Sequence, residues 1–177
     1  TGGSGSIAGL QVYAAAHDGY TWLGDVAHTV SGWRTLGYAD LGWEDFYGFY
    51  AASSPYVLFV SGNSPYQTAQ QLFDAMRGDP SMKWGNAGLG SINQLTGSLM
   101  LEKLGLKGNS VPYDGGRSAA IKVVAGEVTW SWCGLSDILD LAQSGDIRIL
   151  GICDSSPREI DCAKGNYTVP SLLDDYP

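Results

Sequence analysis

The sequence has little charge, and positive charge is the scarcer sign. Lys and Arg total 10 among 177 residues against 18 Asp and Glu, which gives a formal net charge of -8. A nucleic-acid backbone is bound by clustered basic side chains, so we expect no nucleic-acid partner. A small anion is not excluded, because backbone N–H groups and helix N-termini bind carboxylates locally while salt screens the overall charge.

Long apolar runs are also missing. No stretch approaches the roughly 20 apolar residues that a membrane-spanning helix needs. Hydrophobic residues still make up 44% of the chain, and glycine is abundant at 25 residues. This composition predicts a globular chain with a packed core, as one medium domain or two small lobes.

Cysteine is scarce, and its spacing does not suit a metal site. None of Cys133, Cys153 and Cys162 belongs to a C-x-x-C pair or has the histidine spacing of a zinc site, so we expect no metal and no cofactor. Cys133 lies in the apolar stretch 128–135, which favours a buried thiol. Cys153 and Cys162 either form a disulfide in an oxidising compartment or are ordinary small side chains near a loop.

The serines considered as nucleophiles have no histidine close to them in the sequence that could act as a base. Ser91, Ser118 and Ser136 have no histidine neighbour in the sequence, and His17 and His28 lie far from them. A nucleophile needs an adjacent base, and no such pair is visible. We therefore predict that the protein is not an enzyme.

Helical and strand-like segments alternate along the chain, which predicts an α/β fold with a largely parallel sheet. Thr68 is the expected N-cap of one helix. We expect helices over residues 7–16, 68–77, 91–104, 118–125 and 136–144, and strands over residues 20–23, 56–60, 83–85, 110–113, 127–133 and 147–153.

Two glycine loops lead from a predicted strand into a predicted helix, at residues 85–91 and 113–118. In open α/β sheets, ligands bind beyond the carboxyl ends of the strands, where glycine allows close backbone approach and helix N-termini offer N–H groups. Each loop alone also fits a simple tight connection, and neither has the Gly-Lys-Ser/Thr ending of a nucleotide-binding loop. Arg117 either binds a carboxylate with both ends of its guanidinium or is an exposed residue at a helix start.

Six motifs follow one another along the chain. They are the glycine-rich segment 2–7 followed by Asp-Gly-Tyr-Thr at 18–21, Ser-Ser-Pro at 53–55 before an apolar strand, the glycine loop at 85–91, Val-Pro-Tyr-Asp-Gly at 111–115, Ala-Gly-Glu-Val at 125–128, and Ser-Ser-Pro at 155–157. In this order and spacing they resemble the substrate-binding proteins of the tripartite tricarboxylate transporter family, often called Bug proteins.

The resemblance implies a periplasmic-binding-protein-like fold of type II, the Venus flytrap, with parallel-dominated sheets. Family members are longer, so we expect a chain truncated at both ends, with one lobe nearly complete and one partial. Residues 1–60 would form the partial first lobe and residues 61–150 the second, while residues 151–177 would cross back toward the first.

The function implied is that of a solute-binding protein in the periplasm or another extracytoplasmic compartment. It would capture a small carboxylate between its lobes, such as a di- or tricarboxylate, an amino-acid-like acid or an aromatic acid. Its partners would be that ligand and the membrane subunits of a transporter. An alternative is a ligand-sensing flytrap domain of a receptor or regulator.

The family's ligand contacts can be carried over by position. They fall on Gly88, Gly90 and Ser91, on Tyr113, Asp114 and Gly115, on Cys133, Gly134 and Leu135, on Ala27, His28 and Thr29, and on Ser53 and Ser54.

Two residues of this list and one neighbouring segment also have an alternative interpretation. His28 is either a ligand contact or a surface or structural residue, and the second is the commoner role of a single histidine. Asp114 stands where the family usually has lysine, so it either points away from an anionic ligand or faces a cationic group on it. The aromatic segment 33–50 fits core and lobe surface, although a ring stacked on an aromatic acid stays open.

Overall fold

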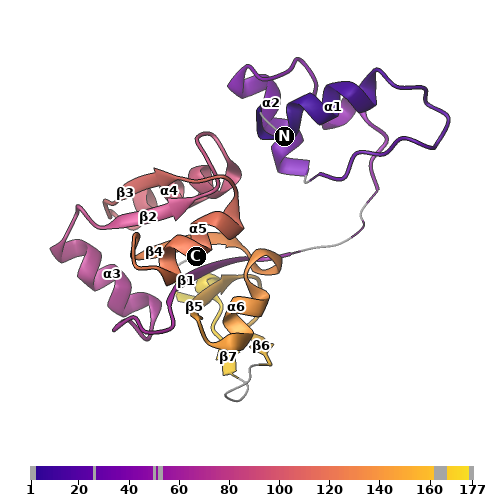
Figure 1. Ribbon diagram of the computed structural model, residues 1–177. Coiled ribbons are helices and arrows are strands. Elements are labelled where there is room, and N and C mark those ends of the chain that lie inside the picture. The colour runs from indigo at the N-terminus through magenta and orange to yellow at the C-terminus, as the bar shows by residue number, and fades with distance from the viewer. Residues whose placement is uncertain (1–2, 26, 50, 52–53, 162–166, 176–177) are drawn as a thin grey trace. The chain divides into compact units, whose positions relative to one another are not determined.

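The computed structural model describes residues 3–25, 27–49, 51, 54–161 and 167–175. The chain forms two compact units (Figure 1). The smaller comprises residues 1–52 with 90–92, and the larger comprises residues 53–89 and 93–177. The assignment of residues 1–60, 61–150 and 151–177 to parts of two lobes stays a prediction.

The elements follow one another in an alternating order. The smaller unit contains η1 (Gly3–Gly5), α1 (Ser6–Tyr13), α2 (Ala27–Leu36) and η2 (Trp43–Asp45). The rest of the chain forms β1 (Tyr56–Ser61), α3 (Ala69–Gly78), β2 (Lys83–Asn86), α4 (Ile92–Lys103), β3 (Asn109–Pro112), α5 (Gly116–Val124), β4 (Trp130–Gly134), η3 (Leu135–Asp137), α6 (Leu139–Ser144), β5 (Ile147–Cys153), β6 (Arg158–Ile160), β7 (Tyr167–Val169) and α7 (Leu172–Asp175).

A five-stranded sheet in the order β3-β2-β4-β1-β5 organises the larger unit. β2 runs parallel to both β3 and β4, whereas β1 is antiparallel to both β4 and β5. Four of the five strands therefore share one direction, and β1 alone opposes them. The predicted α/β class with a parallel-dominated sheet is confirmed.

The sheet is buried on both faces, as the side chains of β1 show. Leu58 and Val60 belong to the cluster that packs with α3 and α4, and Val57 and Phe59 belong to the cluster that packs with α5 and α6. All four side chains are fully buried. Two-sided burial requires an apolar run rather than an alternating pattern, which is why residues 56–60 were readable as a strand from sequence.

Two tryptophans on adjacent strands form the centre of the first cluster. Trp84 on β2 and Trp130 on β4 are direct neighbours in the sheet, and their rings stack at 5.0 Å with an interplanar angle of 10°. Neither indole N–H has a hydrogen-bond acceptor in the described part of the chain. The pair is therefore held by ring packing and burial, at the cost of two unsatisfied donors.

Helix ends explain where the predicted boundaries hold and where they shift. Thr68 is confirmed as the N-cap of α3, since its hydroxyl accepts the N–H of Gln71 at 3.2 Å. At the end of α5, Gly126 adopts φ 75° and the N–H of Glu127 bonds to Lys122 O. That closing turn occupies the first residues of the predicted strand 127–133, so β4 begins only at Trp130.

Two predicted elements are corrected. No strand forms at residues 20–23, where Trp22 Nε1 donates to Gly19 O and the N–H of Tyr20 donates to Asp18 Oδ1. A strand needs a partner strand for its N–H and C=O groups, and these residues make local bonds instead. The predicted helix 136–144 is divided into η3 and α6, because Ile138 leaves helical geometry with φ -132°. The antiparallel pair of β6 and β7 was not predicted.

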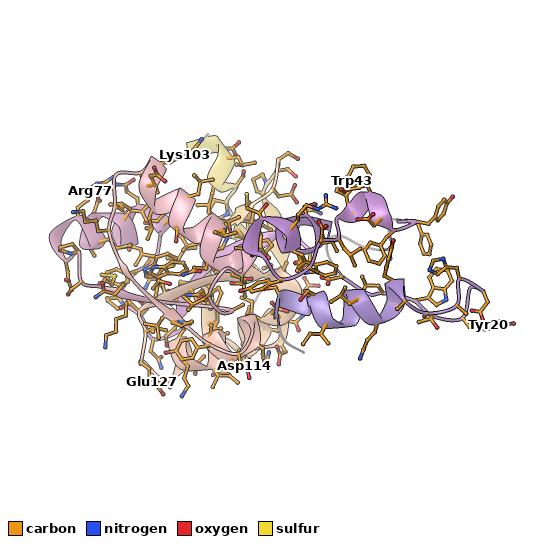
Figure 2. The ribbon with its side chains drawn as sticks, turned by 90° about the horizontal axis from the view of Figure 1, so that it is seen from above. Tyr20, Trp43, Arg77, Lys103, Asp114 and Glu127 are labelled. Atoms are coloured by element: carbon orange, nitrogen blue, oxygen red, sulfur yellow. The ribbon has the colours of Figure 1, made fainter. Side chains whose placement is uncertain are left out.

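The smaller unit has a small core around one tryptophan. Trp33 is fully buried, and its Nε1 donates to Ser4 O at 2.8 Å. Gly9 of α1 lies against this ring so closely that a Cβ atom there would overlap it. Trp33 thus fulfils the core expectation for the aromatic segment. Tyr20 and Trp43, labelled in Figure 2, are exposed at 88% and 66%.

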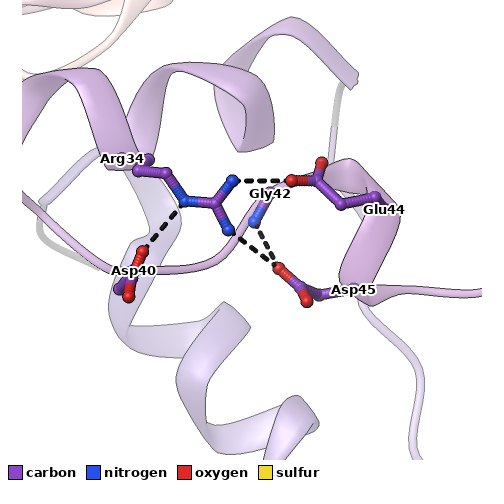
Figure 3. Close-up of polar contacts among 5 residues, drawn as sticks. All are labelled: Arg34, Asp40, Gly42, Glu44 and Asp45. Carbon is purple, nitrogen blue, oxygen red and sulfur yellow. Dashed lines mark hydrogen bonds and ion pairs between the residues drawn. The ribbon is translucent and has the colours of Figure 1, made fainter.

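Arg34 orders the surface of this unit through three carboxylates (Figure 3). Its guanidinium contacts Asp40 at 2.9 Å, Glu44 at 2.6 Å and Asp45 at 3.3 Å, and Asp45 also accepts the N–H of Gly42. The hydrogen bonds to Glu44 and Asp40 raise the pKa of Arg34, with Glu44 the larger contributor. The network pins the 40–45 segment to α2.

Arg148 provides a stability test within the larger unit. From β5 its guanidinium donates to the main-chain oxygens of Gly62, Ser64 and Tyr66 at 3.0–3.3 Å, which holds the loop after β1. We expect Arg148→Met to lower the free energy of unfolding by about 2 kcal/mol, because three carbonyls lose a charged donor. Urea unfolding followed by tryptophan fluorescence measures this. Arg77→Met, which removes an exposed arginine paired with Asp74, should cost less than about 0.5 kcal/mol. Equal losses in the two variants would contradict the role of Arg148.

Candidate functional site

Three loops of the larger unit emerge at the same edge of the sheet. β2 ends at Asn86, β3 at Pro112 and β4 at Gly134, and these three strands are parallel. The carboxyl ends of parallel strands meet at one edge, where α/β proteins place their ligand sites. The predicted contacts at residues 88, 113–115 and 133–135 therefore come from three neighbouring loops.

A buried amide joins the first two loops. Asn86 is fully buried, and its Nδ2 donates to Ser110 Oγ at 2.8 Å while its Oδ1 accepts the N–H of Gly88 at 3.0 Å. Its main-chain oxygen accepts the N–H of Tyr113 at 2.9 Å. Gly88 has φ 117°, a conformation that favours glycine, and its Cβ position lies 3.6 Å from Tyr113 O. The structure thus places Gly88 beside Tyr113, and their contacts with a ligand stay predictions.

The N-cap position of α5 has open space beside it. Gly115, its N-cap, has φ 100° and no neighbouring atom within 4 Å of its Cβ position, and no side chain caps the helix. The first N–H groups of a helix have no acceptor within the helix and form its positive end. A carboxylate is the natural partner for such a group of donors.

Ser54 joins the end of β4 from far away in the sequence. Its hydroxyl accepts the N–H of Ser136 at 3.1 Å, and the neighbouring Pro55 O accepts the N–H of Leu135 at 2.9 Å. Ser54 Oγ also lies 3.4 Å from the Cβ position of Gly134. The predicted residues Ser54, Gly134 and Leu135 are therefore neighbours, whereas Ser53 lies outside the described residues.

Cys133 contributes its side chain to the core. It is fully buried, and desolvation raises the pKa of its thiol far above the usual range. The buried-thiol interpretation is confirmed, and a ligand contact from this residue would have to come from its main chain. Cys162 lies outside the described residues, so its pairing with Cys153 stays a prediction.

Arg117 is paired with a carboxylate of the protein itself. Its Nη2 lies 2.7 Å from Asp140 Oδ2, its Nη1 contacts the other oxygen of Asp140, and Nη1 also donates to Asp137 O at 3.1 Å. The guanidinium lowers the pKa of the Asp140 carboxyl. The structure therefore favours the exposed helix-start interpretation of Arg117 over a ligand contact.

The structure adds Asp137, which the sequence analysis missed. A Cβ atom on Gly116 would stand 2.5 Å from Asp137 Oδ2, so the missing side chain at Gly116 makes room for this carboxylate against the first turn of α5. Burial raises the pKa of Asp137, an effect that Arg117 partly offsets. The residue as a whole is exposed, so water reaches its carboxylate. Its sequence signal was weak, because it lies within a segment predicted as continuous helix.

The remaining predicted residues belong to the smaller unit. Ala27, His28 and Thr29 form the first turn of α2, and the side chains of Ala27 and His28 lie outside the described residues. Gly90, with φ 71°, and Ser91 also group with this unit. Their contacts with a ligand stay predictions.

Within the described residues, no group of three or more His, Cys, Asp or Glu side chains could hold a metal ion. In the same part of the chain, no helix has the length and hydrophobicity to cross a membrane.

Comparison with known families assigns the chain. Residues 1–160 match the sequence model described as "Tripartite tricarboxylate transporter family receptor". The chain belongs to this family. A search of curated proteins finds no significant match.

Solved structures show the same fold. A TctC solute-binding protein from Polaromonas is 22% identical, with a TM-score of 0.75 over 98% of this chain and 58% of its own. MatC from Rhodopseudomonas palustris with bound malate is 20% identical, with a TM-score of 0.74 over 97% of this chain and 65% of its own. R. palustris Rpa4515 with adipate is 21% identical, with a TM-score of 0.73 over 99% of this chain and 64% of its own. The chain thus spans about three fifths of the length of these relatives.

Asp137 gives a test of the electrostatics at this site. Folding raises the pKa of the Asp137 carboxyl, which means that the folded protein favours the neutral form of this group. The charged form therefore destabilises the folded protein, and this cost appears as the pH rises through the pKa. We expect Asp137→Asn to raise the urea midpoint of unfolding at pH 7 and to lose this advantage at pH 3, where the native aspartate is protonated. Unfolding curves at both pH values measure the difference. An equal midpoint at pH 7 would contradict the desolvation of Asp137.

Proposed function

We propose that this protein is an extracytoplasmic solute-binding protein that captures a small carboxylate and presents it to the membrane subunits of a transporter. The observation that carries the proposal is the open amino end of α5 beside Gly115, in a chain of the tripartite tricarboxylate transporter receptor family. Membership of the family supports the receptor role, and the uncapped helix end supports a negatively charged ligand.

The geometry of the loops supports a carboxylate in particular. The bonds of Asn86 hold the loop of Gly88 against that of Tyr113, and Gly115 leaves space before α5. Backbone donors fixed in this way bind an anion without first being ordered, which lowers the entropic cost of binding. Two of the structural relatives have malate and adipate bound, which are both small dicarboxylates.

A binding role also agrees better with the side chains than a catalytic one. Cys133 is a buried thiol with a raised pKa, and the thiolate is the nucleophilic form. His17 Nε2 lies 3.1 Å from Tyr13 O, at the end of α1 in the smaller unit. The buried Cys133 thiol is therefore poorly suited to act as a nucleophile.

Calorimetric titration of the chain with small carboxylates tests the proposal. We expect saturable binding of at least one acid of two to six carbons, with a neutral sugar as a negative control. Gly115→Ala should weaken binding at least about tenfold, because alanine is strained at φ 100° and the loop must shift.

Gly126→Ala is the matched control for this glycine. Gly126 also has positive φ and open space at its Cβ position, but it lies at the opposite end of α5. The Gly126→Ala variant should lose stability because alanine is strained at positive φ, and it should bind ligand with the affinity of the original chain. Binding of sugars alone, or equal loss of affinity in both variants, would contradict the proposed site.

A further inference from the structure

We propose that the bond between Asp114 and Gly115 is a site of spontaneous covalent modification, at which the chain isomerises to isoaspartate as the protein ages. The bond lies at the start of α5, where Gly115 is the N-cap, in the loop that the proposed function assigns to the carboxylate ligand. The modification itself does not depend on that function, whereas its effect on ligand binding rests on it.

The sequence restricts the positions where this chemistry is favourable. Asp-Gly pairs occur at residues 18–19 and 114–115, and no Asn-Gly pair occurs. In an Asp-Gly pair the main-chain nitrogen of glycine can attack the side-chain carboxyl carbon of aspartate, because glycine has no side chain to obstruct the ring that forms. Whether a pair reacts in a folded protein depends on how firmly the structure holds the carboxylate and the glycine.

The structure holds the Asp114–Gly115 pair loosely. Asp114 is exposed (Figure 2), and it is its main-chain oxygen that accepts the hydroxyl of Ser118 at 2.9 Å. Among the described residues, no hydrogen bond or ion pair holds the Asp114 carboxylate. Gly115 has φ 100° and no atom within 4 Å of its Cβ position, so its backbone has room to rotate. The N–H of Gly115 donates to Tyr113 O at 3.0 Å, in a turn of only three residues.

The Asp18–Gly19 pair is held more firmly. Asp18 Oδ1 accepts the N–H of Tyr20 at 3.1 Å, and Gly19 O accepts Trp22 Nε1 at 2.7 Å. Rotation of the Asp18 carboxyl toward the glycine nitrogen breaks the first bond, and movement of Gly19 disturbs the second. We therefore expect the pair at 114–115 to react faster than the pair at 18–19.

The reaction needs only the protein and water. A bond forms between Gly115 N and Asp114 Cγ, and the amide proton leaves with the carboxyl hydroxyl as water, which gives a cyclic imide. Water then opens the ring. Attack at Cγ restores aspartate, whereas attack at the main-chain carbonyl carbon of residue 114 yields isoaspartate, and no atom is oxidised or reduced.

Isoaspartate would change the start of α5 in two ways. The chain would run through Cβ and Cγ of residue 114, so that one additional methylene separates Tyr113 from Gly115. The former main-chain carbonyl of residue 114 would become a free carboxylate. Ser118 Oγ donates to this carbonyl oxygen in the unmodified protein, so the new negative charge would lie at the first turn of α5. There it would interact with the positive end of the helix and repel a carboxylate ligand.

Incubation of the folded chain in water enriched in heavy oxygen measures the reaction. Each opening of the ring adds one oxygen atom from the solvent, so the peptide that contains residues 114–115 gains mass whichever product forms. After digestion in ordinary water, fragment masses locate the label and chromatography separates the isoaspartyl peptide. We expect label to accumulate at 114–115 about threefold or more faster than at 18–19, because one hydrogen bond of ordinary strength must first break at Asp18.

Two glutamate variants assign the label. Asp114→Glu should abolish the label at its position, because the ring would need one more carbon and forms far more slowly. Asp18→Glu is the matched control, because it removes the other Asp-Gly pair and should leave the labelling rate at 114–115 unchanged. Asp146, which precedes isoleucine, gives the background exchange of an aspartate that has no glycine after it.

Calorimetric titration with malate and adipate, before and after ageing, measures the consequence for the ligand loop. We expect the number of binding sites per chain to fall in proportion to the isoaspartyl fraction, because modified chains should bind at least about tenfold more weakly. In Asp114→Glu the number of sites should not change with ageing, whatever its affinity.

The outcomes separate the two proposals. Absence of label at 114–115, or label that accumulates there no faster than at 18–19, would overturn the modification site. An unchanged number of binding sites in a sample that contains isoaspartate would overturn its effect on the ligand loop. Absence of carboxylate binding before ageing would refute the proposed function and leave the labelling result standing.

Discussion

The buried amide of Asn86 is the interaction on which the rest of the site depends. One side chain and its own carbonyl join the end of β2 to β3, to the glycine loop and to the start of the Tyr113 loop. Such a buried polar group is stable only when its bonds are satisfied, so each partner position is fixed once the sheet forms. The open helix end at Gly115 is then held in place by the sheet, and the loops need little order of their own.

Regular structure was predictable where burial imposes a pattern. The apolar run of β1, the N-cap at Thr68 and the alternation of strands with helices each follow from local chemistry, and each was found. The strand expected at residues 20–23 fails for the complementary reason. A strand is stabilised by its neighbours in a sheet, and its own residues carry no information on whether a neighbour is present.

The site was predictable in its loops but not in its electrostatics. Gly88 and Gly115 stand out in the sequence because they lie in glycine loops between a predicted strand and a predicted helix. In the structure both have positive φ and lie at one edge of the sheet. The bond from Ser136 to Ser54 joins residues 82 positions apart, and the approach of Asp137 to Gly116 depends on where η3 ends. Charge placement of this kind depends on tertiary packing, so it appears only in three dimensions.

The acidity of the chain and its proposed affinity for carboxylates are compatible because they act at different distances. The net charge of -8 is spread over the whole chain and is screened within about 10 Å at moderate salt, whereas helix N–H groups act at hydrogen-bond distance. A local group of backbone donors can therefore bind a carboxylate in a chain of negative net charge.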